Sequence, residues 1–206
     1  GGHLLSWSRS VPGGRCDGEP RDTDLRIWDV ASGSCVRTLR GHAGEVGGAL
    51  VLPDGNLLSW SHDRTLKVWD ASSGRCLRTL VGHAGRVFGA LLLPGVGVLS
   101  WGDGAALDVW DTEAGQCVRS LEGHAGGIWG ASLLPRGAAL SWSWDHTLRI
   151  WDVASGRCTR TLAGHTDVVW GARDLSGDSL LSWSNDRTLR VWDVSTGQCR
   201  QTLEGH

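Results

Sequence analysis

The chain has 206 residues, 40% of them hydrophobic and 20% charged, with a formal net charge of -2 at pH 7, which describes a soluble globular protein with enough apolar material for a core. No apolar stretch approaches the ~20 residues of a membrane-spanning helix, and the first residues lack the basic and apolar parts of a secretory signal, so we expect a cytoplasmic protein without a membrane partner. The 20 basic and 22 acidic residues are interspersed, which argues against the basic stripe of a nucleic-acid-binding protein.

Two features of the composition are unusual. The chain contains no Met, which indicates a processed product or a fragment of a longer protein. Its aromatic residues are 13 Trp and one Phe, with no Tyr. A Trp content of this kind indicates repeated duplication of one Trp-bearing unit.

The sequence repeats with a fixed period. Single cysteines and Gly-His pairs each recur every 41 residues, with no insertion or deletion between copies. A constant period of this length predicts one supersecondary unit that is used repeatedly. The residues that mark the period are Cys35, Cys76, Cys117, Cys158 and Cys199, and His42, His83, His124, His165 and His206.

Residues 43–83 show the content of one unit most clearly. An apolar run at 46–52 ends in a Pro-Asp-Gly turn, and β-prone segments at 57–61, 65–69 and 76–80 follow, separated by polar turns. The segment at 65–69 alternates polar and apolar residues, as half-buried strands do. Four short antiparallel strands with no helix between them are the pattern of a β-propeller blade.

The motifs of each unit resemble those of the WD40 repeat family. A Gly-His pair is followed by a Ser-x-Asp turn and then by a Leu-Arg-Val-Trp-Asp type strand, across essentially the whole chain. The near identity of the copies, including the Leu-Ser-Trp-Ser strands, is similar to recently amplified bacterial WD40 arrays. The Trp-Asp pairs begin at Trp28, Trp69, Trp110, Trp151 and Trp192.

This resemblance implies an all-β, WD40-type β-propeller array over residues 1–206. We expect a partial N-terminal blade at 1–42, which starts at its second strand and carries an insertion at 9–20, and complete repeats at 43–83, 84–124, 125–165 and 166–206. Four complete blades and a partial one predict an open arc or a segment of a larger propeller, with a five-bladed ring as the alternative. Unpaired edges then make further WD40 repeats in the same chain, or self-association, expected partners.

Ser, His and Asp recur together in the units and superficially suggest a hydrolase triad. Because the set is repeated, it is too frequent for one active site. The resemblance implies instead a structural tetrad in which a Trp, a Ser, a His and an Asp satisfy each other's hydrogen bonds. In the second repeat Ser59 is favoured over Ser61 as the serine. The sets are His42, Ser59, Asp63 and Trp69; His83, Ser100 and Trp110; His124, Ser141, Asp145 and Trp151; and His165, Ser182, Asp186 and Trp192.

The set of the third blade, with His83, lacks its aspartate, because Gly104 stands where Asp63 stands in the second blade. We therefore expect the third blade to be the least stable. The periodic cysteines lie too far apart for a zinc site, so we expect no metal and no cofactor, and we interpret them as small buried side chains. Cys16, within the insertion, is the one expected to be exposed.

Positions that differ between the copies indicate where a partner binds. Large aromatic residues lie five positions after three of the Gly-His histidines, and variable residues precede the turn aspartates. In the WD40 family these neighbourhoods face the top of the propeller, where they would form an apolar patch with polar tips. Packing of the aromatic rings inward between blades is the alternative. The predicted partner-binding residues are Phe88, Trp129, Trp144, Trp170, His62 and Asn185.

These observations predict a non-catalytic scaffold that binds a protein or peptide, as the recognition segment of a larger, bacterial signalling protein. The first alternative is an enzyme with a site at the channel mouth, which would need a set of polar residues present in only one blade. The sequence shows no such set outside the insertion. The second alternative is an amplified segment with no dedicated ligand.

Overall fold

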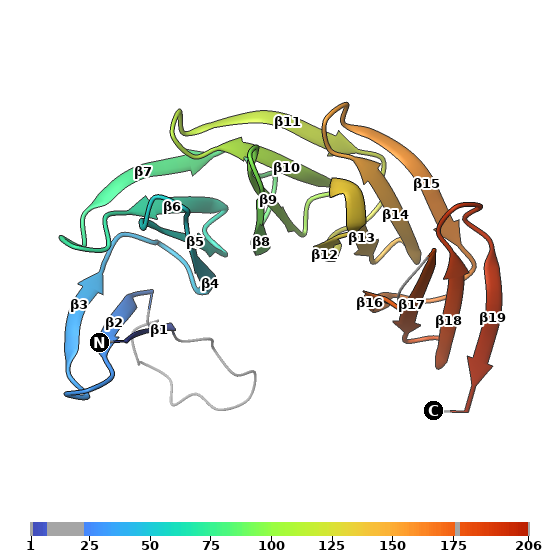
Figure 1. Ribbon diagram of the computed structural model, residues 1–206, viewed down its shortest axis with the longest axis horizontal. Helices are drawn as coiled ribbons and strands as arrows, with labels where there is room; N and C mark the ends of the chain where they lie inside the picture. Colours follow the sequence, from blue (N-terminus) through green and yellow to red (C-terminus); the bar gives the residue numbers. More distant parts are fainter. Residues whose placement is uncertain (1, 8–22, 176–177, 206) are drawn as a thin grey trace.

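The computed structural model describes residues 2–7, 23–175 and 178–205 of the chain. They form five antiparallel sheets that follow one another along an open arc (Figure 1). Blade one contains the three strands β1 (His3–Trp7), β2 (Leu25–Asp29) and β3 (Cys35–Leu39). The predicted insertion at 9–20 and Cys16 lie outside the described residues.

Each of the other blades has four strands in sequential order. Blade two comprises β4 (Val46–Val51), β5 (Leu57–Ser61), β6 (Thr65–Trp69) and β7 (Cys76–Val81). Blade three comprises β8 (Val87–Leu93), β9 (Gly97–Gly102), β10 (Ala106–Asp111) and β11 (Gln116–Glu122). Blade four comprises β12 (Ile128–Leu133), the 3-10 turn η1 (Pro135–Gly137), β13 (Ala139–Ser143), β14 (Thr147–Asp152) and β15 (Arg157–Ala163). Blade five comprises β16 (Val169–Asp174), β17 (Ser179–Ser184), β18 (Thr188–Asp193) and β19 (Cys199–Glu204).

The predicted fold is confirmed. Four blades are complete, the described residues of the first form three strands without an innermost one, and the strands of blade two fall at the predicted positions to within a residue. Strands β4, β8, β12 and β16 line the concave side of the arc, and β7, β11, β15 and β19 form its outer rim (Figure 1). Blades one and five lie at opposite ends of the arc and do not meet.

The core of the molecule lies between blades rather than within one. Between blades two and three, for example, the leucines Leu58, Leu66 and Leu80 pack in one cluster with Val98 and Trp110. The Trp of each Trp-Asp pair in blades two to five is at most 1% exposed, at the interface with the preceding blade. Adjacent blades therefore depend on each other for burial of their apolar side chains.

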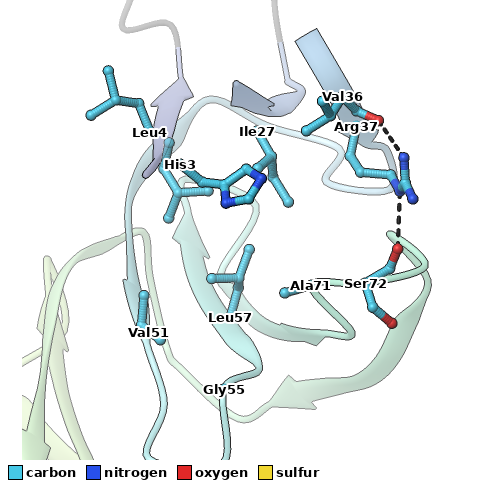
Figure 2. Close-up of a pocket in the computed structure, with 11 residues that line it drawn as sticks. His3, Leu4, Ile27, Val36, Arg37, Val51, Gly55, Leu57, Ala71 and Ser72 are labelled. Atoms are coloured by element: carbon cyan, nitrogen blue, oxygen red, sulfur yellow. Dashed lines mark hydrogen bonds between the residues drawn. The ribbon is translucent and has the colours of Figure 1, made fainter. Parts of the chain in front are cut away.

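Blade one leaves a cavity of about 860 Å³ at its interface with blade two (Figure 2). Its lining is mainly apolar and includes Leu4 and Leu57. In the next three interfaces a leucine at or just after the end of the innermost strand, Leu52, Leu93 or Leu134, is buried in the cluster. Among the described residues, blade one has no such strand, and the cavity occupies the corresponding position.

The interpretation of the cysteines as buried side chains is wrong. Cys35, Cys76, Cys117 and Cys199 are exposed, and Cys158 is half-buried. They lie at or near the start of the outermost strands, whose residues mostly face solvent. In blade two the Sγ of Cys76 donates to the carbonyl oxygen of Arg78 at 3.3 Å, and this local contact recurs in every blade.

Within the part of the chain that the structure describes, no helix is long and apolar enough to cross a membrane.

Candidate functional site

Two groups of side chains bear on function: the repeated tetrads inside the blades and an aromatic patch on the concave side. In blade two the tetrad forms a continuous chain of hydrogen bonds. The indole Nε1 of Trp69 donates to Ser59 Oγ at 2.8 Å, Ser59 Oγ lies 2.7 Å from His42 Nε2, and His42 Nδ1 lies 2.8 Å from Asp63 Oδ2. Strands β5 and β6 supply the Ser and the Trp, while loops at the ends of strands supply the His and the Asp.

The same geometry recurs in two other blades. In blade four the Trp-to-Ser, Ser-to-His and His-to-Asp distances are 2.8, 2.8 and 2.7 Å, and in blade five they are 2.8, 2.7 and 2.7 Å. The structure thus brings together every residue predicted for these tetrads. Ser61, the alternative serine of blade two, instead accepts a hydrogen bond from the backbone N–H of Asp63.

The carboxylate of each complete tetrad is ionised. Burial raises the pKa of Asp63, but hydrogen bonds from His42, Thr65 and the backbone N–H of Ala43 outweigh burial and hold the pKa well below its ordinary value. Asp145 and Asp186 show the same balance. Burial lowers the pKa of His165, despite the neighbouring carboxylate of Asp186. The histidine of blade five is therefore neutral at pH 7, with Nδ1–H donating to the carboxylate.

This arrangement does not suit nucleophilic catalysis. The tetrad serines Ser59, Ser141 and Ser182 are fully buried, and their hydroxyls already contact both an indole and an imidazole. A nucleophilic hydroxyl must reach the substrate carbonyl, and the buried position excludes this. The same side chains are suited to satisfying each other's hydrogen bonds in the interior.

Blade three corrects one expectation. The turn has Gly104 at the tetrad position of the aspartate, but His83 does have a carboxylate partner: Asp108 on β10 places Oδ2 3.1 Å from His83 Nδ1. The rest of the chain is retained, with Ser100 Oγ 2.5 Å from His83 Nε2 and 2.8 Å from Trp110 Nε1. An alignment of the repeats contains the signal for this, because Asp108 stands where blade two has Lys67.

The six predicted partner-binding residues form one connected row. Four of them make up the aromatic patch, which we define as Phe88, Trp129, Trp144 and Trp170. Trp129 is its centre, with its ring centroid 5.7 Å from Phe88, 6.0 Å from Trp144 and 4.7 Å from Trp170. Phe88 and Trp144 are 6.0 Å apart.

Polar residues stand at both ends of the patch. His62 lies 6.1 Å from the ring of Phe88, and Trp170 Nε1 donates to the Oδ1 of Asn185. Arg86, which sequence reasoning missed, places its guanidinium 5.5 Å from the centre of the Phe88 ring and forms an ion pair with Asp103 at 2.8 Å. The row therefore runs from the turn of blade two to the turn of blade five.

The rings of the patch are not buried between blades. Trp129, Trp144 and Trp170 are 38%, 36% and 39% exposed, and Phe88 is half-buried. The residues just before them in the three inner strands, Val87, Ile128 and Val169, are fully buried. Because successive side chains of a strand point in opposite directions, the buried residue anchors the strand while the aromatic ring stays accessible. Exposed indoles gathered in this way are typical of binding surfaces.

Among residues 2–7, 23–175 and 178–205, no three His, Cys, Asp or Glu side chains are grouped so that they could hold a metal ion. The blades, their repeated tetrads and the buried Trp at each interface define a β-propeller repeat protein. The family model for "WD domain, G-beta repeat" matches residues 33–70, 115–152 and 156–193, just over half of the chain. The chain belongs to this WD40 repeat family.

Curated relatives share short segments with the chain. The nuclear distribution protein nudF 1 of Talaromyces marneffei is 49% identical over 45 residues, which are 21% of this chain and 10% of that protein. The nuclear distribution proteins PAC1 of Arthroderma otae and Coccidioides posadasii are 41% and 38% identical over 66 residues, 27% of this chain and 14% of theirs. These relatives are fungal, and the chain spans a small part of their length.

Proposed function

We propose that this chain is a non-catalytic scaffold that binds a protein or peptide through the aromatic patch. The observation that carries the proposal is the continuous contact of four aromatic rings from three blades, with polar residues at both ends of the row. The tetrads stabilise the blades that hold these rings in place. The burial of the tetrad serines and the repetition of the tetrads both support a structural role.

The patch has the chemistry of a binding surface with an apolar centre and a polar rim. Within the described part of the chain, the indole Nε1 groups of Trp129 and Trp144 donate no hydrogen bond, so both are available to a partner. His62 and Asn185 offer polar atoms at the two ends. A partner that suits this surface has apolar side chains flanked by hydrogen-bonding groups, in an extended segment long enough to cross the inner strands.

The proposal extends to the context of the chain. We propose a recognition segment of a larger, bacterial signalling protein that acts in the cytoplasm and binds neither nucleic acid nor membrane. Among the described strands, β1 pairs with β2 alone, and its other edge and the cavity beside it support association with further WD40 repeats or with another copy of the chain. The near identity of the repeats supports recent amplification.

Selection of peptides from a displayed random library, followed by affinity measurement, tests the proposed surface. Replacing Trp129 and Trp170 by Ala is expected to lower the affinity for the selected peptides at least ~10-fold, because aromatic side chains that become buried in an interface dominate binding energies. The matched control replaces Leu77 and Val118, exposed apolar residues of the outer strands β7 and β11, by Ala and should bind as the original chain does. Equal affinity of the Trp variant and the control would overturn the proposal.

A further inference from the structure

Blade three contains a cavity of about 480 Å³ between the loop at 82–84, the turn residues 104–105 and the strands β10 and β11. It lies where blade three carries smaller side chains than its neighbours. In blade four the equivalent turn and strand contain a carboxylate, an imidazole, a hydroxyl and a guanidinium. The residues of blade three are Gly104, Ala105, Ala106 and Asp108, in place of Asp145, His146, Thr147 and Arg149.

In blades four and five this space is next to an arginine of the chain itself. A Cβ atom added to Gly123 would lie 2.9 Å from Arg149 Nη1, and one added to Gly164 would lie 2.8 Å from Arg190 Nη1. The equivalent glycine of blade three, Gly82, meets only the ring of Trp110 within 4 Å. The fold thus accommodates a guanidinium beside this glycine in two blades, and blade three provides the space without the side chain.

The cavity is also lined by a buried carboxylate. Asp108 is 7% exposed, accepts a hydrogen bond from Ser120 Oγ at 2.5 Å and faces His83 Nδ1 at 3.1 Å. Burial lowers the pKa of His83, which favours the neutral imidazole beside Asp108 at pH 7. Within the described residues, His83 is the ion-pair partner of Asp108, and no Lys or Arg reaches it.

Further acceptors line the same cavity. In the pairing of β10 with β11, Ala106 lies opposite Glu122 and Asp108 lies opposite Ser120, so all four residues share one face of the sheet. Glu122 is exposed at the rim of the cavity. Ser120 Oγ and Cys117 Sγ both donate to Oδ1 of Asp108, and His83 Nδ1 faces Oδ2. A carboxylate has about four lone-pair sites, so Oδ2 can accept one further hydrogen bond.

We propose that this cavity is a binding site for a guanidinium group, such as the arginine side chain of a partner peptide. The Asp108 carboxylate accepts the guanidinium N–H groups in the interior, and Glu122 attracts the cation at the rim. The site is independent of the aromatic patch and would stand if the patch bound nothing.

Titration of the labelled chain with Nα-acetylarginine methylamide, followed by NMR signals of the His83 imidazole, tests the site. Saturable binding is expected, and the corresponding citrulline derivative, which is nearly isosteric but uncharged, should bind at least ~10-fold more weakly. Free L-arginine serves as a second ligand, and tighter binding of the free amino acid than of the methylamide would identify a metabolite rather than a peptide. Equal binding of the arginine and citrulline derivatives would overturn the proposal.

Two variants locate the site in the cavity. Asp108→Asn should lower the affinity for the arginine methylamide about 10-fold or more. Asp108→Arg introduces the residue type of blades four and five and should abolish saturable binding. Asp54→Asn removes an exposed carboxylate of the turn after β4 and serves as the control. Unchanged affinity in both Asp108 variants would contradict the assignment.

Discussion

At the scale of single residues, each tetrad serine holds two buried polar groups together. Ser141 Oγ contacts the indole of Trp151 and the imidazole of His124, both at 2.8 Å. Replacing Ser141 by Ala should therefore leave a buried indole N–H without an acceptor and cost about 1–3 kcal/mol of unfolding free energy. Chemical denaturation checks this. Ser155→Ala, in the exposed turn after β14, is the control, and an equal effect of both substitutions would contradict the network.

Blade three gives a second prediction at this scale. Because Asp108 already pairs with His83, Gly104→Asp alone would place a second carboxylate near the first and gain little stability. Combining Gly104→Asp with Asp108→Arg reproduces the charge pattern of blade five, where Asp186 and Arg190 flank His165. The double variant should be more stable than the original chain by about 1 kcal/mol. A larger gain from Gly104→Asp alone would show that Asp108 does not compensate for the missing aspartate.

Most residues of the site were predictable because the period aligns equivalent positions. The Gly-His pairs, the turn aspartates and the Trp-Asp pairs recur in register, so their shared role follows from repetition. Asp108 was missed because it comes from a strand position that carries Lys or Arg in the other complete blades. A comparison restricted to the tetrad positions does not show that a carboxylate from another position takes the place of the turn aspartate. The contact of Arg86 with Phe88 depends on the direction of a long side chain, which the sequence does not specify.

At the scale of elements, the inner strands lie against the Trp of the neighbouring strand. In blade four a Cβ atom added to Gly130 of β12 would overlap the indole ring of Trp142 in β13. Gly130→Ala should therefore destabilise the chain by about 1–3 kcal/mol, since an extra methyl group in a filled interior forces side chains apart. Gly104→Ala is a suitable control, because its Cβ would make an ordinary contact of 3.6 Å with Ala84. Thermal unfolding of the two variants separates these outcomes, and equal midpoints would contradict the packing.

The strands themselves were predictable, because apolar alternation and Gly-rich turns recur in every unit. The burial of the outer strand was not. The cysteines of this strand were interpreted as buried, but the strand is the outer edge of each sheet, and only one of its residues in blade two, Leu80, is fully covered. Position at the edge of a sheet is a property of the assembled arc and overrides the local pattern around Cys76.

At the scale of the whole molecule, stability should fall as the pH decreases. Asp63, Asp145 and Asp186 have a lower pKa in the folded chain than the ordinary 3.8, so their stabilisation is present above that pH and is lost below it. Burial lowers the pKa of His83 and His165 from 6.5, so below pH 6.5 the unfolded chain binds protons more readily and stability decreases there too. Melting midpoints measured from pH 8 to pH 3 should decline below 6.5 and more steeply below 4. A midpoint that rises between pH 6.5 and 5 would contradict this.

The central claim is that the tetrad Trp residues are buried structural members of the blades, whereas Trp129, Trp144 and Trp170 belong to an exposed binding patch. The indole N–H signals of the 13 Trp residues, recorded by NMR during titration with a selected peptide, test this division directly. We predict that the signals of Trp129, Trp144 and Trp170 shift on binding. The tetrad signals of Trp69, Trp110, Trp151 and Trp192 should stay in place and exchange slowly with solvent. Shifts confined to the tetrad signals, with the patch unchanged, would contradict the account.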